Sequence, residues 1–297
     1  MTTKTETLGV GLHEGVPSAV YHADPCAQPS LSSGIARIIV EQTPAHARLK
    51  HPRLGGTRDI EATREMDFGG LVHALLAGQP EETAEYVVSE FDEFRTKEAR
   101  SWRDEVRASG RTPVKKAMLE AAGSCAGAMK KAISQRPDTL NPFDAGKPEV
   151  TAIWQESDLV TCRARIDRLV QDAGGFCDVW DFKTCASVSA DSITRTIIDH
   201  GYNAQAAFYL RGLRQLLPDY AGRFSFLFAF IEADPPHTVR VVPMTEAWLS
   251  FGNMIVSRAI ALWGECMATN TWPSYSGTNL IIEPPSWYAA KLEGLSP

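Results

Sequence analysis

The second half of the chain alternates between strand-like and helix-like patterns of apolar residues. β-Branched and aromatic residues predict a strand over residues 149–155, and residues 224–231 form a continuous apolar run that is typical of a strand buried on both faces. A shorter strand is expected over residues 238–242. Apolar positions spaced three and four apart predict helices over residues 202–217 and 246–267.

The first half is patterned mainly for helices. Residues 21–30 contain two prolines and are expected to form an extended arm. A serine-capped helix is expected over residues 31–40, and Thr43 and Pro44 are typical of the cap and the first turn of a short helix that follows.

Another predicted helix, over residues 60–76, contains two glycines and a histidine. Gly69 and Gly70 each cost about 1 kcal/mol relative to alanine inside a helix, so we expect another backbone to approach them closely. His73 lies among apolar neighbours, and a buried histidine needs a partner for its ring nitrogens. Taken alone, such a histidine is more typical of a core or surface position than of a ligand.

The order of the elements predicts an α/β fold. Helices come first, and strands, a helix, a strand pair and a long helix follow, which favours a central mixed β-sheet flanked by helices. No repeat or clear boundary divides the sequence, so we expect a single domain over residues 1–297. Residues 1–148 form its mainly helical N-terminal part, and residues 149–297 form the sheet core and the C-terminal helix.

Composition narrows the class of protein. The hydrophobic fraction of 44% and charged fraction of 22% are ordinary for a globular protein, and the net charge of -6 argues against a general nucleic-acid coat. No apolar stretch follows the N-terminus or approaches membrane-spanning length, so neither a secretion signal nor a membrane partner is expected. The six scattered cysteines form no Cys-x-x-Cys pair, which predicts reduced thiols and a cytoplasmic location.

Two acidic residues and one lysine form the most informative pattern. Residues 172–175 are a turn signal. With the turn centred on Gly174, Asp167 and Asp181 face each other across an antiparallel hairpin, and Lys183 projects from the same face. Facing carboxylates repel unless a cation lies between them. A hard divalent cation with a lysine beside it is typical of phosphodiester hydrolysis.

Each further candidate has a plainer interpretation. Asp-x-Lys alone fits a solvated strand face, but here apolar residues flank the strand and Asp167 precedes it in register. Gln205 and Tyr209 share one helix face, which fits either a site or ordinary packing on the sheet. Glu149 fits a metal or water ligand and a strand-end charge equally well. The downstream pattern favours a site role for His73.

Arginines near the hairpin suggest contacts with DNA. Arg163 and Arg165 are expected on the face that carries Asp167, where they fit either ion pairs with carboxylates or bidentate contacts with phosphates. Residues 95–136 look largely helical and are rich in lysine and arginine up to Lys131. We favour a nucleic-acid track there over a solvated helix surface, because the rest of the chain is acidic. No Gly-x-Ser-x-Gly elbow and no Gly-x-x-x-x-Gly-Lys-Ser/Thr phosphate loop occur.

Taken in order, these residues resemble the motifs of the PD-(D/E)XK nuclease superfamily, in its RecB-like branch. That branch has a helix histidine, an aspartate, an Asp-x-Lys and a Gln-x-x-x-Tyr helix. The matching residues here are His73, Asp167, Asp181-Phe182-Lys183, Gln205 and Tyr209. The chain most resembles the RecE (exodeoxyribonuclease VIII) type, through segments at residues 21–24, 31–33, 43–47, 69–73, 149–154, 165–167, 181–184, 201–205 and 284–287. Ile166 stands where the name of the superfamily has proline, a replacement common in this branch.

The resemblance implies a restriction-endonuclease-like core and a Mg²⁺-dependent exonuclease, with Mn²⁺ as a substitute. It would degrade one strand of double-stranded DNA from an end, 5′ to 3′. The implied metal ligands are His73, Asp167, Asp181 and the main-chain carbonyl of Phe182, with Glu149 as a further candidate. Lys183 is expected to act on the attacking water or the phosphate, Gln205 and Tyr209 to brace the site, and Arg163 and Arg165 to hold the scissile strand.

The resemblance also implies partners. A ring-shaped homo-oligomer and a RecT-type single-strand annealing protein are expected, in a bacterial or phage recombination system. Only Cys266 lies late in the chain, so an iron–sulfur cluster is not expected. The competing interpretations are a related endonuclease or single-strand repair nuclease, a non-catalytic DNA-binding relative, and a structural protein whose Asp-x-Lys is accidental. The intact Asp167, Asp181 and Lys183 argue against the non-catalytic relative.

Overall fold

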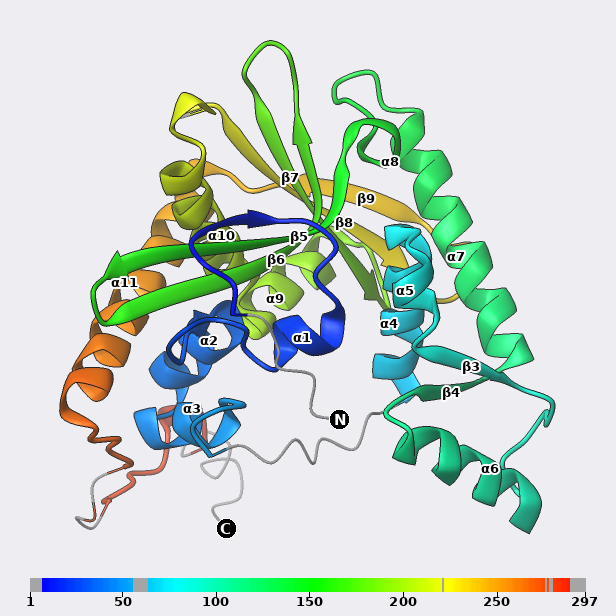
Figure 1. Cartoon of the computed structure of the whole chain (residues 1–297), viewed down its shortest axis with the longest axis horizontal. Helices are drawn as coiled ribbons and strands as arrows, with labels where there is room; N and C mark the ends of the chain where they lie inside the picture. Colours follow the sequence, from blue (N-terminus) through cyan, green and yellow to red (C-terminus); the bar gives the residue numbers. More distant parts are fainter. Residues whose placement is uncertain (1–6, 56–63, 221, 276, 278–279, 289–297) are drawn as a thin grey trace, which may run out of the picture.

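A mixed β-sheet forms the centre of the computed structural model, which describes residues 7–55, 64–220, 222–275, 277 and 280–288 (Figure 1). Within these residues seven strands form the sheet, in the order β1-β5-β6-β7-β8-β9, and β2 pairs with β6. The strands are β1 (Gly11–His13), β2 (Leu31–Ser32), β5 (Lys147–Ser157), β6 (Val160–Gln171), β7 (Cys177–Cys185), β8 (Phe224–Glu232) and β9 (Val239–Pro243).

Most neighbouring strands run antiparallel, because short turns join β5 to β6 and β6 to β7. Two pairs run parallel, namely β7 with β8 and β2 with β6. The β7–β8 connection is long because two helices, α9 (Ala190–His200) and α10 (Tyr202–Leu216), lie within it. The predicted α/β fold with a central mixed sheet is therefore confirmed.

Helices cover both faces of the sheet and create two apolar cores (Figure 1). One core lies under α2, α3, α9, α10 and α11 and contains Trp154, Phe208 and Trp263. The other lies under α4 and α7 and contains Met129 and Trp180. The remaining helices and their bounds are α1 (Ser18–His22), α2 (Ser33–Glu41), α3 (Pro44–Lys50), α4 (Arg64–Ala77), α5 (Pro80–Thr83), α6 (Lys97–Ala108), α7 (Lys116–Ser134), α8 (Pro142–Ala145) and α11 (Glu246–Thr269).

Local sequence signals set several of these boundaries. The Ser32 hydroxyl accepts from the backbone N–H of Ile35 at the start of α2, and the Thr43 hydroxyl accepts from that of His46 at the start of α3. Pro44 follows Thr43 at the first helical position, as expected. Both predicted N-caps are confirmed.

Other expectations need correction. The extended arm at residues 21–30 overlaps the end of α1, and the stretch at residues 95–136 is broken by β4. Strand β4 (Thr112–Lys115) pairs with β3 (Tyr86–Ser89) in a separate two-stranded sheet beside α6, the helix that carries much of the basic run. The start of the helix predicted over residues 60–76 lies outside the described residues.

Side chains, and not another backbone, approach the two glycines of α4 closely. A Cβ on Gly70 would lie 2.5 Å from the Tyr86 hydroxyl oxygen, and one on Gly69 would lie 3.1 Å from the Thr184 hydroxyl oxygen. The close approach expected at these positions is therefore present, but its partners are Tyr86 and Thr184.

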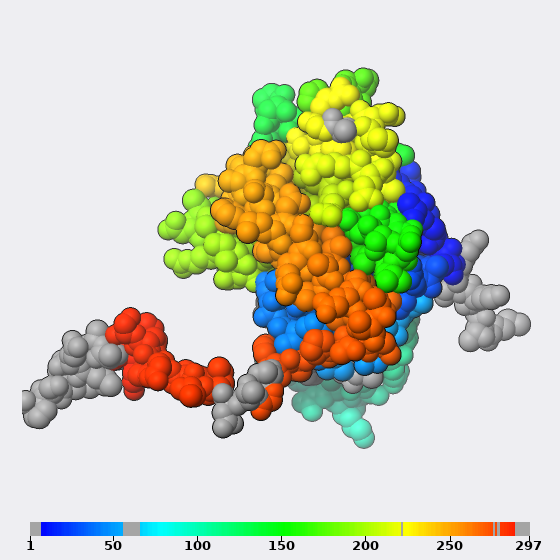
Figure 2. Space-filling model, turned by 90° about the vertical axis from the view of Figure 1, so that its left-hand side faces the viewer, coloured from blue at the N-terminus to red at the C-terminus, as the bar shows by residue number. Residues whose placement is uncertain are grey.

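Helix α11 lies across the face of the molecule seen in Figure 2, and residues 280–288 extend away from the body. Residues 280–285 of this tail are irregular and residues 286–288 are helical, and Leu280, Ile281 and Ile282 are largely exposed. Among the described helices, none has the length and apolar character needed to span a bilayer.

Gly252 lets α11 pack directly on α10, and we expect Gly252→Ala to lower the free energy of unfolding by about 1–3 kcal/mol. The added Cβ would overlap the carbonyl oxygen of Asn203 and lie 2.9 Å from the Cβ of Ala207. Gly127 in α7 is a matched control, since a Cβ there meets nothing within 4 Å. Gly127→Ala is expected to stabilise the chain by roughly 0.5–1 kcal/mol. Urea unfolding of the two variants measures both effects, and equal stabilities would contradict this packing.

Candidate metal centre

Three carboxylates lie in one row across three adjacent strands. Strands β5 and β6 pair Pro148 with Arg168 and Val150 with Ile166. The position between these two pairs therefore places Glu149 opposite Asp167. In β6 and β7 the pairing ends at Arg168↔Trp180, and the same register continued by one residue places Asp167 opposite Asp181. The facing arrangement expected from the turn thus agrees with the strand register.

The row lies where the strands depart from regular geometry. Glu149 has a φ of 51°, in the left-handed region that non-glycine residues rarely adopt. Along β6, the residues that face the larger core change from even-numbered, ending at Ile166, to odd-numbered, starting with Leu169. Asp167 lies at this change of phase, so its side chain is directed differently from what a regular strand would give.

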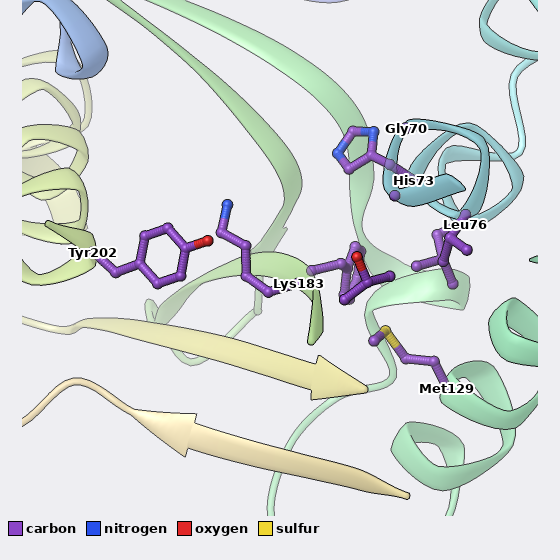
Figure 3. A pocket seen from close by; sticks show the side chains of 10 residues that line it. Gly70, His73, Leu76, Met129, Lys183 and Tyr202 are labelled. Carbon is purple, nitrogen blue, oxygen red and sulfur yellow. The ribbon is translucent and has the colours of Figure 1, made fainter. Parts of the chain in front are cut away.

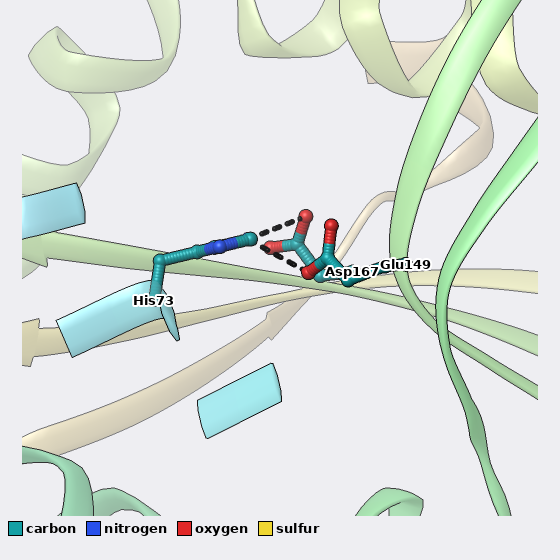
Figure 4. Close-up of side chains that lie close together, drawn as sticks. All are labelled: His73, Glu149 and Asp167. Carbon is teal, nitrogen blue, oxygen red and sulfur yellow. Dashed lines mark ion pairs between the residues drawn. The ribbon is translucent and has the colours of Figure 1, made fainter. Parts of the chain in front are cut away.

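His73 joins two of these carboxylates from α4 (Figure 4). Its Nε2 lies 3.0 Å from Oδ1 of Asp167 and 3.5 Å from Oε1 of Glu149. One ligand atom from each of the three residues lies within 4.8 Å of the others. The exposed fractions of Glu149 and Asp167 are 1% and 9%, so this anionic pair is shielded from bulk water. Glu149 therefore lies inside the cluster instead of at a solvated strand end.

Asp181 has a second set of partners. Its Oδ1 lies 2.6 Å from Nζ of Lys183, and its Oδ2 accepts a hydrogen bond of 2.6 Å from the side-chain amide of Gln205. Tyr209 hydrogen-bonds Gln205 one helical turn further along α10. The structure thus brings the Asp-x-Lys pair and the Gln-x-x-x-Tyr helix together, with the tyrosine buried at the back.

The backbone of Phe182 links the two sets. Its N–H donates to Oδ2 of Asp167 at 2.8 Å, beyond the point where β6 and β7 stop pairing. In an extended strand the N–H and C=O of one residue point to the same side. The carbonyl oxygen of Phe182 is therefore directed to the same open edge as Asp167, which is the position expected for a main-chain ligand.

Both arginines assigned to DNA have protein partners instead. Arg163 is 3% exposed, and its Nη1 donates to the Ser30 carbonyl at 2.7 Å and lies 3.2 Å from Oδ1 of Asp24. Nε of Arg165 lies 2.8 Å from Oε2 of Glu149, and its Nη2 contacts Glu82. We therefore correct the assignment: Arg163 holds the N-terminal segment against β6, and Arg165 neutralises part of the carboxylate cluster.

Some residues around the site were missed from the sequence. Glu82 lies on α5 and Asp24 follows α1, and both reach β6 only through the tertiary fold. His51 is fully buried, with Nε2 lying 3.4 Å from Oδ2 of Asp24. No local spacing relates these residues to the hairpin, so no pattern along the chain could have revealed them.

Burial and mutual repulsion shift the titration of the cluster. Burial raises the pKa of Glu149 to about 7 and that of Asp181 to about 6, with Asp167 adding to both and Lys183 partly opposing the shift of Asp181. Burial disfavours the charged form of His73, but the adjacent Asp167, and then Glu149 and Asp181, raise its pKa to about 9. Burial also opposes the charge of Asp167, yet His73 and Lys183 hold its pKa below the usual value.

The donor set fits a divalent cation. Within the described residues, both side-chain oxygens of Glu149 and Oδ1 of Asp181 are buried without an aligned hydrogen-bond donor, although cationic groups lie near them. Buried carboxylate oxygens without such donors are costly unless a cation neutralises them. Carboxylate and main-chain oxygens are the ligands of hard cations such as Mg²⁺ and Mn²⁺. His73, Glu149 and Asp167 offer ligand atoms within 4.8 Å of one another, and Asp181 and the Phe182 carbonyl lie beside them on the next strand.

We expect the melting temperature of the metal-free chain to fall between about pH 5 and pH 9. The raised pKa values of Glu149 and Asp181 mean that their protonation favours the folded state, and this contribution disappears as the pH rises through about 6 to 7. The charge of His73 likewise stabilises the fold below its unfolded pKa of 6.5, and this contribution is lost through about pH 9. Thermal denaturation in EDTA across this range measures the fall.

Added Mn²⁺ is expected to reverse this trend, because a cation replaces the lost protons and binds more tightly as the carboxyls ionise. Glu149→Gln is expected to weaken both the pH trend in EDTA and its reversal by Mn²⁺. A melting temperature in EDTA that stays flat or rises over this range contradicts the assigned cluster.

A cavity of about 310 Å³ adjoins the cluster (Figure 3). His73 and Lys183 both line it, so it connects the two sets of site residues. Its other lining residues are Gly69, Gly70, Val72, Leu76, Met129, Phe182, Thr184 and Tyr202. The site therefore has room beside it for a ligand larger than a metal ion.

Comparisons with known proteins agree with this fold. A crystal structure described as that of a "putative exonuclease" from Eubacterium rectale superposes with a TM-score of 0.56 at 13% identity, covering 94% of this chain and 98% of that one. At this identity the match concerns the fold alone. A second crystal structure, of SSO0001, has a TM-score of 0.29 at 12% identity over 62% of this chain and 71% of that one, and nothing is drawn from it. No curated protein matches the sequence.

A family model provides the assignment. The model described as "PDDEXK-like domain of unknown function (DUF3799)" matches residues 39–283, which include every member of the cluster. The match covers most of the chain, and the structure has the restriction-endonuclease-like sheet that the family description implies. The chain therefore belongs to the DUF3799 family of PDDEXK-like domains.

Proposed function

We propose that this protein is a metal-dependent nuclease that hydrolyses phosphodiester bonds of DNA. One observation carries the proposal: Glu149, Asp167 and Asp181 lie in a row across three strands, with Lys183 bound to the last of them. An ion-pair network that served stability alone would satisfy its carboxylates with aligned donors. Here both side-chain oxygens of Glu149 are buried and lack such donors.

We assign Mg²⁺ to this cluster, with Mn²⁺ as a substitute. Asp167, Asp181 and the Phe182 carbonyl would hold it, and Glu149 and His73 would complete the set directly or through water. When bound, the cation supplies polarisation of the phosphate and a lowered pKa for bound water.

The surrounding side chains have defined tasks in this proposal. Lys183 stays protonated, because Asp181 outweighs burial and raises the pKa of the lysine above its usual value. It therefore acts as a fixed positive charge that orients water and stabilises the developing charge on the phosphate, rather than as a base. Gln205 holds Asp181, and Tyr209 holds Gln205.

For the substrate, we propose the ends of double-stranded DNA. Two observations support this substrate. The Eubacterium rectale structure is described as that of a "putative exonuclease". The motifs also resemble those of the RecE type, in which degradation runs 5′ to 3′. A ring of subunits and a RecT-type annealing partner belong to the same proposal. Arg163 has no part in it, since its charge is used inside the fold.

Strand-specific labelling tests the function. Linear duplex DNA labelled at either the 5′ or the 3′ end, and covalently closed circular DNA, are incubated with the protein in Mg²⁺ and in EDTA. We expect degradation of the linear duplex only, with early release of the 5′ label, and none in EDTA or with Asp167→Asn. Cleavage of closed circles would identify an endonuclease, and equal activity in EDTA would contradict the metal assignment.

A further inference from the structure

The cavity beside the cluster has a lining that distinguishes it from a simple packing defect. Four of its ten lining residues carry a polar side chain, namely His73, Lys183, Thr184 and Tyr202, while the rest are glycine or apolar. Figure 3 shows the Tyr202 hydroxyl and the Lys183 ammonium on one side of the cavity and His73 on the other. At about 310 Å³ it is large enough for a phosphate group together with part of a nucleotide.

The ring of Tyr202 is held in place by its neighbours. It stacks on Phe228, with centroids 5.2 Å apart and planes 24° apart, and on His200, with centroids 5.4 Å apart and planes 23° apart. Nζ of Lys183 lies 4.8 Å from the centroid of the same ring. Stacking on a nucleobase is therefore not the use of this tyrosine, and its remaining chemical group is the hydroxyl.

That hydroxyl has no hydrogen-bond partner among the described residues, and Tyr202 lines the cavity. The side chain of Lys183 approaches the same region, held by Asp181 at 2.6 Å. A phenolic O–H and an ammonium group that border one cavity form a pair of donors suited to a single anionic oxygen. The adjacent carboxylates exclude an anion unless a divalent cation neutralises them.

We propose that this cavity binds the phosphate of the nucleotide at which the strand is cleaved, and that the Tyr202 hydroxyl donates a hydrogen bond to that phosphate beside the Lys183 ammonium. The inference rests on the proposed nuclease function and adds to it a substrate-contacting residue. Tyr202 and Gln205 are three residues apart on α10, so their side chains lie next to each other on the helix surface. In this proposal Tyr202 contacts the substrate while Gln205 holds Asp181.

The test separates the hydroxyl from the ring. Tyr202→Phe removes only the oxygen and keeps the stacking on Phe228 and the contact with Lys183. Tyr220→Phe is the matched control, because Tyr220 lies on the short 3₁₀ helix after α10 and does not line the cavity. Two readouts are measured: kcat/KM on linear duplex DNA in Mg²⁺, and the Kd of deoxyadenosine 5′-monophosphate in Ca²⁺.

We expect Tyr202→Phe to lower kcat/KM roughly 10- to 100-fold and to weaken mononucleotide binding about 10-fold or more, as loss of a hydrogen bond to a charged group would. Tyr220→Phe is expected to match the wild type in both. Unchanged values for Tyr202→Phe in both measurements, or a wild-type chain that binds no mononucleotide in Ca²⁺, would overturn the inference. A wild-type chain that binds mononucleotide through Tyr202 but leaves DNA intact would refute the nuclease function and not the phosphate site.

Discussion

Lys183→Met is expected to lower the rate of DNA hydrolysis about 1,000-fold while the chain stays folded. The ammonium of Lys183 is fixed by Asp181 and by the ring of Tyr202, so in the proposed reaction it would act on the phosphate without reorganisation. Methionine keeps most of the apolar stem and removes the charge. Without that charge, the pKa of Asp181 rises further, which lessens the cost of leaving a buried unpaired anion in the fold.

A rate assay under single-turnover conditions, with circular dichroism of the same sample, measures this effect. Lys50→Met is the control, because Lys50 is an exposed residue in the last turn of α3, outside the basic stretch at residues 95–136. We expect the control to retain wild-type activity. Activity of Lys183→Met within a few-fold of the wild type would remove the lysine from the reaction, even if the metal cluster were confirmed.

Arg163→Ala is expected to lower the free energy of unfolding by about 3–5 kcal/mol. Its side chain is 4% exposed, and the guanidinium lies against Asp24, whose side chain is fully buried. Removing Arg163 takes away a close buried cation from Asp24, which keeps the more distant Arg53 at 3.6 Å and His51 at 3.4 Å beside its hydrogen bonds from Ser30. The Ser30 carbonyl and hydroxyl also lose the donor that Arg163 provides, so the segment between α1 and α2 keeps fewer contacts with β6 beyond the pairing of β2.

Urea unfolding measures this loss, and Arg195→Ala provides a matched control because Arg195 is exposed on α9. The control is expected to change stability by less than about 0.5 kcal/mol. If Arg163→Ala were as stable as the wild type but bound DNA more weakly, the original assignment of Arg163 to the scissile strand would be restored.

Local chemistry explains why part of the site could be predicted from the sequence. The turn at residues 172–175 and the two-residue repeat of a strand determine that Asp167, Asp181 and Lys183 share one region. The spacing of Gln205 and Tyr209 on one helix face similarly predicts that both are directed to the sheet, as observed at Asp181. These relations depend on a hairpin and a helix, which are short-range structures.

The remaining features depend on contacts between distant segments. The left-handed φ of Glu149 and the change of phase in β6 cannot be read from residue type, so strict alternation placed Arg163 with the site. The role of Arg163 depends on Asp24, 139 positions earlier in the chain. Short strands such as β1 and β2 carry too few residues for a periodic pattern, and helix α9 was missed although Ser189 caps it.

A crystal structure of the chain with Mn²⁺ would show whether these carboxylates bind one divalent cation. We expect an anomalous-scattering peak within about 2.3 Å of a carboxylate oxygen of Asp167 and of a second from Asp181 or Glu149, close to the Phe182 carbonyl. A fully occupied Mn²⁺ elsewhere, or none at saturating Mn²⁺ with Asp181 still bound to Lys183, would contradict this expectation.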